Sequence, residues 1–474
     1  MAQLNYHTGN FEQNTKKIID TIESSRGKSY LVVFSELSLC GYPPRDLLEF
    51  APFLDQVEAS IERIAAHSVG IHVIIGAPSR NNSGKGKALF NTAFVLGEGR
   101  VMAKVHKTLL PTYDIFDEYR YFEPNTEFGC VEIAGKKVAL SICEDLWNVD
   151  DSPLYRENPM DHLMVEQPDL MINIAASPFS KKQEQRRSDI LKKNAIKYGL
   201  PIIYVNHVGA QTELIFDGDS RFINKHGETI CRLPFFKEHV ETVDLDKQVE
   251  CVTPKPSSIA LVHEALVLGI RDYFKKLGLS KATLGLSGGI DSAVVYALAC
   301  EALGAKNVLP VLMPSRFTHN ASVTEAEQLA KNYGSEYKII PIQNIYSAFE
   351  SELASHFKGL GNDVTEENLQ ARSRGVLLMA LSNKLGYILL NTTNKSEMAV
   401  GYGTLYGDLC GGLSVIGDVY KTSVFELAEY INRGTDMIPR FIIDRPPSAE
   451  LKEDQVDSDS LPSYDTLDPM LFLY

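Results

Sequence analysis

The chain has 474 residues, and its 47 basic and 61 acidic side chains give a formal net charge of −14 at pH 7. This acidic balance argues against a nucleic-acid or anionic-membrane partner, because both need a basic footprint. No stretch approaches the roughly 18 apolar residues of a membrane-spanning helix, and the first residues lack a secretory signal pattern. The seven cysteines are scattered without zinc spacing, so we expect a cytoplasmic protein of two or three domains.

The first half of the chain alternates between strand and helix patterns. Short apolar runs predict buried strands, and a hairpin is expected over 92–105 with its turn at 97–100. The further strands are expected at 30–34, 71–76, 137–142, 170–175 and 202–206, and helices at 11–24, 53–67 and 183–198.

Three chemically capable side chains follow three of these strands. Glu36 comes after the first strand, Lys107 after the hairpin and Cys143 directly after residue 142. Ligands of α/β sheets lie at such strand ends. A thiolate that attacks an amide, a carboxylate that shuttles protons and an ammonium that stabilises an oxyanion together make an amidase. Taken singly, the cysteine is more typical of a buried structural thiol, and the other two of solvated surface charges.

The local strings around these residues resemble the nitrilase (carbon–nitrogen hydrolase) superfamily over roughly residues 2–250. They are SEL at 35–37, GYP at 41–43, KTLLP at 107–111 and SICEDLW at 141–147. The resemblance implies a four-layer αββα sandwich with Cys143 as nucleophile, Glu36 as base and Lys107 as oxyanion stabiliser. It further implies a second supporting glutamate, Glu118, and three residues that hold a glutamine substrate, Tyr113, Ser177 and Lys182.

Two prolines and a polar cluster over 251–258 predict a linker between domain 1–250 and domain 259–474. A helix over 259–276 opens the second domain, and helices separate the strands that follow, so a doubly wound parallel sheet is expected. These strands are expected at 282–286, 307–313, 337–341 and 386–390. The acidic, proline-bearing tail after Arg445 predicts a surface loop.

The string LGLSGGIDS at 284–292 joins a strand to a helix. Paired glycines, serine hydroxyls and a helix N-terminus favour a bound phosphate. Asp291 suits such a place when Mg²⁺ bridges it to the phosphate. No Walker lysine follows. Two alternatives stay open, a turn without a ligand and a nucleophile elbow at Ser287, which needs a late histidine such as His319 or His356.

The string SGGxDS resembles the pyrophosphate loop of the ATP pyrophosphatase superfamily. With ENLQAR at 367–372, NTTNKSE at 391–397, GYGTLYGD at 401–408 and VYKT at 419–422, it is similar to the synthetase half of the glutamine-dependent NAD synthetase family. The resemblance implies that Asp291 and Glu397 hold Mg²⁺. The implied ATP contacts are Gly285, Leu286, Ser287, Gly288, Gly289, Ile290, Asp291, Ser292, Thr392 and Lys421. The implied contacts of the deamidated dinucleotide are Asn368, Glu397, Tyr402, Gly403, Thr404, Leu405 and Asp408.

An amidase joined to such a synthetase implies that ammonia made at Cys143 is consumed near Asp291. We therefore expect glutamine-dependent amidation of deamido-NAD⁺ by way of an adenylate, an enclosed ammonia path, and a homo-oligomer, dimeric or higher. Members of the family extend further at the C-terminus with a basic segment, so a shorter synthetase domain is expected here. The alternatives are an amidohydrolase with an impaired nucleotide-binding half, and a nucleotide-binding protein without catalysis.

Overall fold

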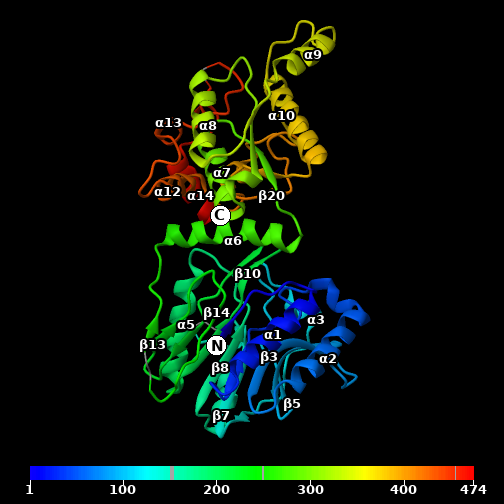
Figure 1. Ribbon diagram of the computed structural model, residues 1–474, viewed down its shortest axis with the longest axis vertical. Helices are drawn as coiled ribbons and strands as arrows, with labels where there is room; N and C mark the ends of the chain where they lie inside the picture. Colours follow the sequence, from blue (N-terminus) through cyan, green and yellow to red (C-terminus); the bar gives the residue numbers. More distant parts are fainter. Residues whose placement is uncertain (150–153, 248–249, 454) are drawn as a thin grey trace. The chain divides into compact units, whose positions relative to one another are not determined.

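The computed structural model describes residues 1–149, 154–247, 250–453 and 455–474 (Figure 1). The chain divides into two compact units, Met1–Pro256 and Ser257–Tyr474, and each is described by itself. Within the described ranges, no helix has the length and apolar character needed to span a membrane.

The first unit contains two main sheets. One has four strands in the order β2-β3-β4-β5, and the other has seven in the order β15-β13-β12-β9-β8-β7-β6. Strands β7, β8 and β9 are parallel neighbours, so their carboxyl ends meet at one edge. The strand bounds are β1 Ala2–Gln3, β2 Leu31–Val33, β3 His72–Arg80, β4 Leu89–Gly97, β5 Arg100–His106, β6 Val131–Ile133, β7 Lys136–Ile142, β8 Leu170–Ala175, β9 Ile202–Asn206, β10 Val208–Gln211, β11 Leu214–Asp217, β12 Arg221–Ile223, β13 Thr229–Arg232, β14 His239–Val240 and β15 Cys251–Val252.

Side-chain alternation along the strands packs the two sheets against each other. On β3, Ile74 joins the core cluster that contains β7 and β8, whereas Val73 and Ile75 join the cluster of the first two helices. Successive residues of a strand point to opposite faces. This arrangement confirms the expected four-layer αββα sandwich. The helices of this unit are α1 Phe11–Ser25, α2 Ala51–Ala66, α3 Glu118–Tyr121, α4 Pro159–Leu163 and α5 Gln183–Tyr198.

The predicted hairpin forms with the predicted turn. Strand β4 ends at Gly97 and β5 begins at Arg100, and these residues pair across the turn. Glu98 and Gly99 both have positive φ, 52° and 75°. A two-residue turn with this geometry matches the right-handed twist of the flanking strands.

The start of the range predicted as a linker is part of the first unit. Cys251–Val252 form β15, which pairs in parallel with β13. This pairing sets Cys251 opposite Cys231, and the two sulfurs form a disulfide. The spacing of the cysteines in the sequence did not indicate this pair.

The second unit is built on a five-stranded parallel sheet in the order β18-β17-β16-β19-β20. Helices α6, α7 and α12 pack on one face and α10 on the other, so the predicted doubly wound sheet is confirmed. The bounds are α6 Ser258–Lys276, β16 Ala282–Gly285, α7 Ile290–Leu303, β17 Val308–Leu312, α8 Asn320–Tyr333, β18 Lys338–Ile339, α9 Gln343–Leu353, α10 Val364–Leu385, β19 Ile388–Asn391, α11 Lys395–Val400, β20 Leu413–Ser414, α12 Lys421–Ile431, α13 Arg440–Asp444 and α14 Tyr464–Leu473.

Two sequence expectations for this unit need correction. The strand predicted at 337–341 shrinks to the exposed pair Lys338–Ile339, because it lies at the sheet edge and pairs on one side only. The tail after Arg445 is more than a surface loop: it carries helix α14, whose Leu467 and Asp468 are buried.

Candidate active sites

Cys143 begins a short 3-10 helix at the end of β7, where the chain leaves the sheet. Its φ is +43°, a region that costs a side-chain-bearing residue about 1–2 kcal/mol. Its side chain is buried. Asn173 on the neighbouring strand β8 donates to the Cys143 carbonyl at 3.4 Å. Backbone strain of this kind concentrates at active sites.

Three predicted catalytic side chains form one buried charge cluster. Lys107 donates to Glu36 Oε1 at 2.7 Å and to Glu118 Oε1 at 2.8 Å. Both Lys107 and Glu36 side chains are fully buried. The Tyr42 hydroxyl also donates a hydrogen bond to Glu118 at 2.9 Å. Two carboxylates therefore share one ammonium where water is excluded, a setting in which charge–charge interactions are strong.

The electrostatics of this cluster favour a neutral nucleophile before substrate binds. Burial, and after it the Glu36 carboxylate, hold the pKa of the Cys143 thiol well above its usual range, although Lys107 opposes the shift. Burial also raises the pKa of Glu118 to about 7, again against the pull of Lys107. A thiol next to a carboxylate can attack as it hands its proton over, without a standing thiolate.

Two further residues hold this cluster in place, and neither role was predicted from the sequence. Asn91 on β4 donates to Glu36 Oε1 at 2.7 Å. The carboxylate of Asp145 accepts from the backbone N–H groups of Thr108, Leu109 and Ile142 at 2.8–3.0 Å. Asp145 thereby ties the segment after Lys107 to the turn that carries the cysteine. The only local signal was its place in the string SICEDLW.

The residues expected to hold glutamine are less closely grouped. The hydroxyl of Tyr113 lies 3.0 Å from both oxygens of Glu144, the residue after the nucleophile, and Tyr155 donates to Glu144 at 3.1 Å. Ser177 is buried after β8 and accepts from Gln183 at 3.3 Å. Lys182 is exposed directly before α5. Glu144 was not singled out in the sequence, although its buried carboxylate faces the same site.

In the second unit, the predicted phosphate loop turns from β16 into α7. Gly288 has φ +81°, and a Cβ atom there would lie 2.3 Å from the carbonyl oxygen of Ser322. Ser287 Oγ accepts from Gly289 N at 3.1 Å and contacts Ser292 Oγ at 3.1 Å. These contacts keep Ser287 within its own loop. The two later histidines are exposed, so the nucleophile-elbow alternative finds no support.

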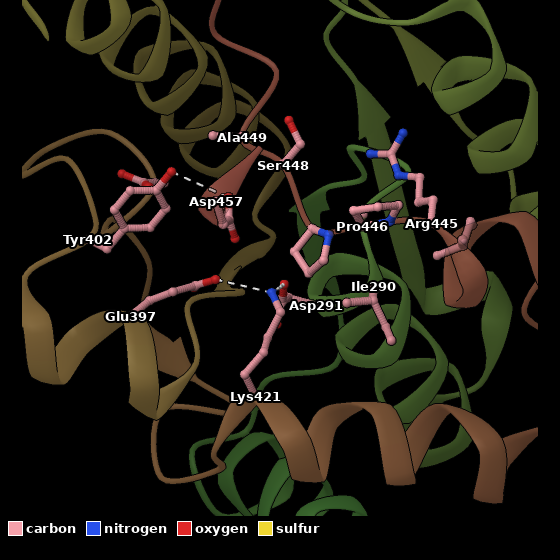
Figure 2. Close-up of a pocket in the computed structure, with 14 residues that line it drawn as sticks. Ile290, Asp291, Glu397, Tyr402, Lys421, Arg445, Pro446, Ser448, Ala449 and Asp457 are labelled. Atoms are coloured by element: carbon pink, nitrogen blue, oxygen red, sulfur yellow. Dashed lines mark hydrogen bonds and ion pairs between the residues drawn. The ribbon is translucent and has the colours of Figure 1, made fainter. Parts of the chain in front are cut away.

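Asp291, at the start of α7, meets two residues from distant segments. Lys421 Nζ lies 2.5 Å from Asp291 Oδ2 and 3.3 Å from Glu397 Oε1. Figure 2 shows these three side chains pointing toward one another. Asn394 donates to Asp291 Oδ1 at 2.9 Å. Burial, and after it Asp291, raise the pKa of Glu397 to about 8. The predicted metal ligands and the predicted phosphate-binding lysine are therefore in direct contact.

The two carboxylates suit a magnesium ion that also binds phosphate. No group of three or more His, Cys, Asp or Glu side chains in the described part of the chain could hold a metal ion. Mg²⁺ keeps several waters and commonly takes one or two protein carboxylates together with substrate phosphates. Asp291 and Glu397 converge on one ammonium, so their oxygens could converge on a cation of that kind.

The predicted dinucleotide contacts form a second layer of this site. Thr404 is held from two sides, because its N–H donates to Asp408 at 2.6 Å and its hydroxyl to Asn368 at 2.7 Å. Tyr402 and Asp408 line the same cavity as Asp291, whereas Leu405 is 65% exposed. Gly403 lies against Leu409, and Thr392 is half-buried just after β19.

The tail supplies one wall of this cavity, which the sequence did not predict. The lining residues are Gly289, Ile290, Asp291, Glu397, Tyr402, Asp408, Lys421, Ile442, Arg445, Pro446, Pro447, Ser448, Ala449 and Asp457. Asp457 accepts from Tyr402 at 3.3 Å (Figure 2). It also accepts from Tyr464 at 2.9 Å. Acidic and proline-rich composition does not distinguish a loop in solvent from one that closes a site.

Comparison with known proteins places these sites in a family. A carbon–nitrogen hydrolase family model matches residues 1–252, and an NAD synthase family model matches residues 262–474. A glutamine-dependent NAD(+) synthetase from Synechocystis is 43% identical, over 99% of this chain and 87% of that protein. One from Thermotoga maritima is 40% identical, over 100% of this chain and 88% of that protein.

A solved structure agrees over the same length. The glutamine-dependent NAD⁺ synthetase from Acinetobacter baumannii in complex with ADP has a TM-score of 0.88 and 37% identity, and the match covers 100% of this chain and 87% of that chain. The fold and the matches define an α/β enzyme in which a carbon–nitrogen hydrolase unit precedes an NAD synthase unit. The chain belongs to the glutamine-dependent NAD(+) synthetase family. It is a ligase of NAD biosynthesis, it binds ATP, and glutamine is its amide donor.

Proposed function

We propose that the first unit hydrolyses glutamine at Cys143 and the second unit uses the ammonia to amidate deamido-NAD⁺ at the expense of ATP. The observation that carries this assignment is a pair of charge clusters: the buried cluster of Glu36, Lys107 and Glu118 beside Cys143, and the partly buried cluster of Asp291, Glu397 and Lys421 at the start of α7. The chemistry of each cluster matches one half-reaction. The overall change is deamido-NAD⁺, ATP, glutamine and water to NAD⁺, AMP, pyrophosphate and glutamate.

In the first half-reaction, the Cys143 sulfur attacks the amide carbon of glutamine while Glu36 takes the thiol proton. The Lys107 ammonium stabilises the oxyanion of the tetrahedral intermediate, and Glu36 passes the proton to the departing ammonia. Water then cleaves the glutamyl thioester and releases glutamate. The carboxylate of Glu144, which accepts hydrogen bonds from two tyrosine hydroxyls, is assigned to form an ion pair with the α-ammonium group of the substrate.

In the second half-reaction, the glycine loop at 285–292 cradles the ATP phosphates, and Lys421 pairs with their negative charge. Asp291 and Glu397 would hold Mg²⁺, which would neutralise charge on the phosphates. The carboxylate of deamido-NAD⁺ attacks the α-phosphorus and releases pyrophosphate. Ammonia then attacks the adenylated carboxyl carbon and releases AMP. Tyr402, Thr404 and Asp408 line the dinucleotide side.

Ammonia supports this last step only as the free base, and at neutral pH most of it is protonated. An enclosed path from the cysteine to the second site keeps it unprotonated, so we infer such a channel. We also infer a homo-oligomer with no nucleic-acid partner.

The test is NAD⁺ formation by a Cys143→Ala variant with either nitrogen source. The variant should lose glutamine-dependent synthesis and keep synthesis from added ammonium salts at the wild-type rate, because only the first site is changed. A Cys130→Ala variant is the matched control, since Cys130 is a half-buried thiol away from the charge cluster. Loss of both activities in Cys143→Ala would contradict the assigned division of labour.

A further inference from the structure

A buried ion-pair network occupies the space between α5 and the outer face of the seven-stranded sheet. Arg187 on α5 bonds Asp217 at 2.5 and 3.1 Å and Asp219 at 2.9 Å. Arg221 on β12 bonds Asp219 at 3.0 Å through Nε and reaches Glu184 of α5 at 2.8 Å. All five side chains are at most 3% exposed. A buried charge that loses its partner is costly, so these groups fix one another.

One end of this network lies at Ser177, one of the residues predicted to hold glutamine. Asp217 accepts from Asn206 at 3.5 Å. The Asn206 side chain also clamps the backbone of Ser177, accepting from its N–H at 2.8 Å and donating to its carbonyl at 3.1 Å. The segment 177–182 runs from Ser177 directly into α5. The network therefore holds this segment at its start through Asn206 and at its end through the first turns of the helix.

The other end of the network lies on the chain that enters the second unit. Glu184 forms ion pairs with Arg232 at 3.5 Å and with Lys255. Burial alone would raise the pKa of Glu184, but Lys255 and Arg221 hold it below its usual range. Lys255 is 41% exposed and stands between Pro254 and Pro256, just before the N-cap of α6, Ser257.

The segment around Lys255 is stiff and firmly attached. Both flanking prolines restrict the backbone and remove donors. Upstream, β15 pairs with β13, and Thr253 N donates to the Arg232 carbonyl at 3.2 Å. Lys255 is thus held on the chain just before α6, and its ion pair with Glu184 ties this stretch to the start of α5.

We propose that Lys255 is a positioning residue for the glutamine reaction. Through Glu184 and the buried network, it fixes segment 177–182 and so sets the affinity of the first site for glutamine. The inference rests on the proposed function, because it places glutamine at Ser177.

The main experiment measures glutamine hydrolysis by the full chain carrying Lys255→Met. Methionine keeps the length of the side chain and removes its charge. The KM for glutamine should rise about threefold to tenfold with kcat nearly unchanged, because the catalytic cluster is untouched. The variant Lys255→Arg should restore the wild-type KM. NAD⁺ formation from ammonium salts should be unaffected.

A matched control separates this role from a general loss of surface charge. Lys247 pairs with Asp244 in the same stretch and is 76% exposed, so Lys247→Met should leave KM unchanged. Glutamine binding to Cys143→Ala and Cys143→Ala/Lys255→Met, measured by calorimetry, gives the affinity directly, since KM equals Kd only when chemistry is slow. The double variant should bind about threefold to tenfold more weakly.

The outcomes are distinct. An unchanged KM and Kd in Lys255→Met would overturn the inference while leaving the proposed function intact. A fall in kcat with a lowered Tm, not restored by arginine, would mean a merely structural lysine and also overturn it. Absence of glutamine hydrolysis in the wild-type chain would instead refute the proposed function, and with it this role.

Discussion

Lys107 donates to Glu36 across 2.7 Å, and neither side chain has exposed surface. The two residues come from the ends of different strands, 71 positions apart. A second carboxylate, Glu118, contacts the same ammonium. A buried charge without a partner destabilises the folded state. The two ion pairs of Lys107 therefore fix the positions of the catalytic side chains as well as supplying their chemistry.

We therefore expect Lys107→Met to damage the first unit in two ways. Loss of the oxyanion donor should lower kcat for glutamine hydrolysis by at least about 100-fold. The two carboxylates left unpaired should cost roughly 3–5 kcal/mol of stability. Initial rates and thermal unfolding measure these effects. Synthesis of NAD⁺ from ammonium salts should persist, because the second unit keeps its own core.

Lys104→Met is the control for this prediction. Lys104 lies on β5, three residues before Lys107, and its exposed side chain approaches the Phe94 ring at 5.3 Å. Its removal should leave hydrolysis within about twofold, because surface substitutions change stability by under about 0.5 kcal/mol. Near-normal hydrolysis by Lys107→Met would remove the lysine from the mechanism.

The glycine loop of the second unit offers a steric test. Alanine at Gly288 would place its Cβ 2.3 Å from the Ser322 carbonyl oxygen, at a φ of +81°. Both the backbone strain and the clash should shift the loop. We expect ammonia-dependent NAD⁺ formation to fall more than about tenfold, with a raised KM for ATP, while glutamine hydrolysis stays normal.

Gly334→Ala separates the clash from the strain. Gly334 ends α8 at φ +71°, and its Cβ would meet nothing within 4 Å. This variant should lose about 1–2 kcal/mol of stability without changing the KM for ATP. Equal effects of the two substitutions on that KM would show that the loop has no special part in binding.

Asp457 tests whether the tail belongs to the site. Its carboxylate accepts from Tyr402 and Tyr464 and is 6% exposed. Asp457→Asn replaces one of these acceptors with an amide donor, so Tyr402 should lose its orientation. The KM for deamido-NAD⁺ should rise about tenfold, the size expected for a lost hydrogen bond to a charged group. Asp465→Asn, an exposed change on the neighbouring helix, should have no effect.

Much of the architecture follows from local patterns. Val73, Ile74 and Ile75 point alternately to the two faces of β3, as expected for successive residues of a strand. The turn at Glu98-Gly99 fixes the position of the hairpin. Strand ends also bring Glu36 and Lys107 together, because β2 and β5 run in the same direction and end on the same side of the four-stranded sheet, with β3 and β4 between them. Periodicity and turn chemistry are properties of a few consecutive residues, so a single sequence displays them.

Long-range partners leave no such mark. In the sequence, Asp145 looks like any other acidic residue, yet its carboxylate accepts hydrogen bonds from three backbone N–H groups of two segments. Asp468 is likewise hidden in the tail, although it bonds Ser396 and the N–H of Thr422, next to Glu397 and Lys421. A carboxylate that caps a distant backbone has the same composition as one in solvent. The roles of the site residues therefore remain predictions for the experiments above.

The raised pKa of Glu118 predicts a pH-dependent stability that one substitution should remove. The folded state holds this proton up to about pH 7, whereas the ordinary value is 4.5. The folded state thus binds more protons than the unfolded state between these values, and stability falls as pH rises through that window. In Glu118→Gln nothing titrates at this position. Its stability relative to wild type should therefore increase by roughly 3 kcal/mol between pH 5 and pH 8.

Unfolding of both proteins by urea at each pH measures this difference. The carboxyl of Asp145, whose pKa burial also raises to about 7, titrates in both proteins and cancels. Glu127→Gln, an exposed substitution nearby, should follow the wild-type curve throughout. Parallel curves for Glu118→Gln and wild type would mean that Glu118 is already ionised at pH 5. Lys107 would then be paired with two fully ionised carboxylates, and Glu118 would have no proton to exchange near neutral pH.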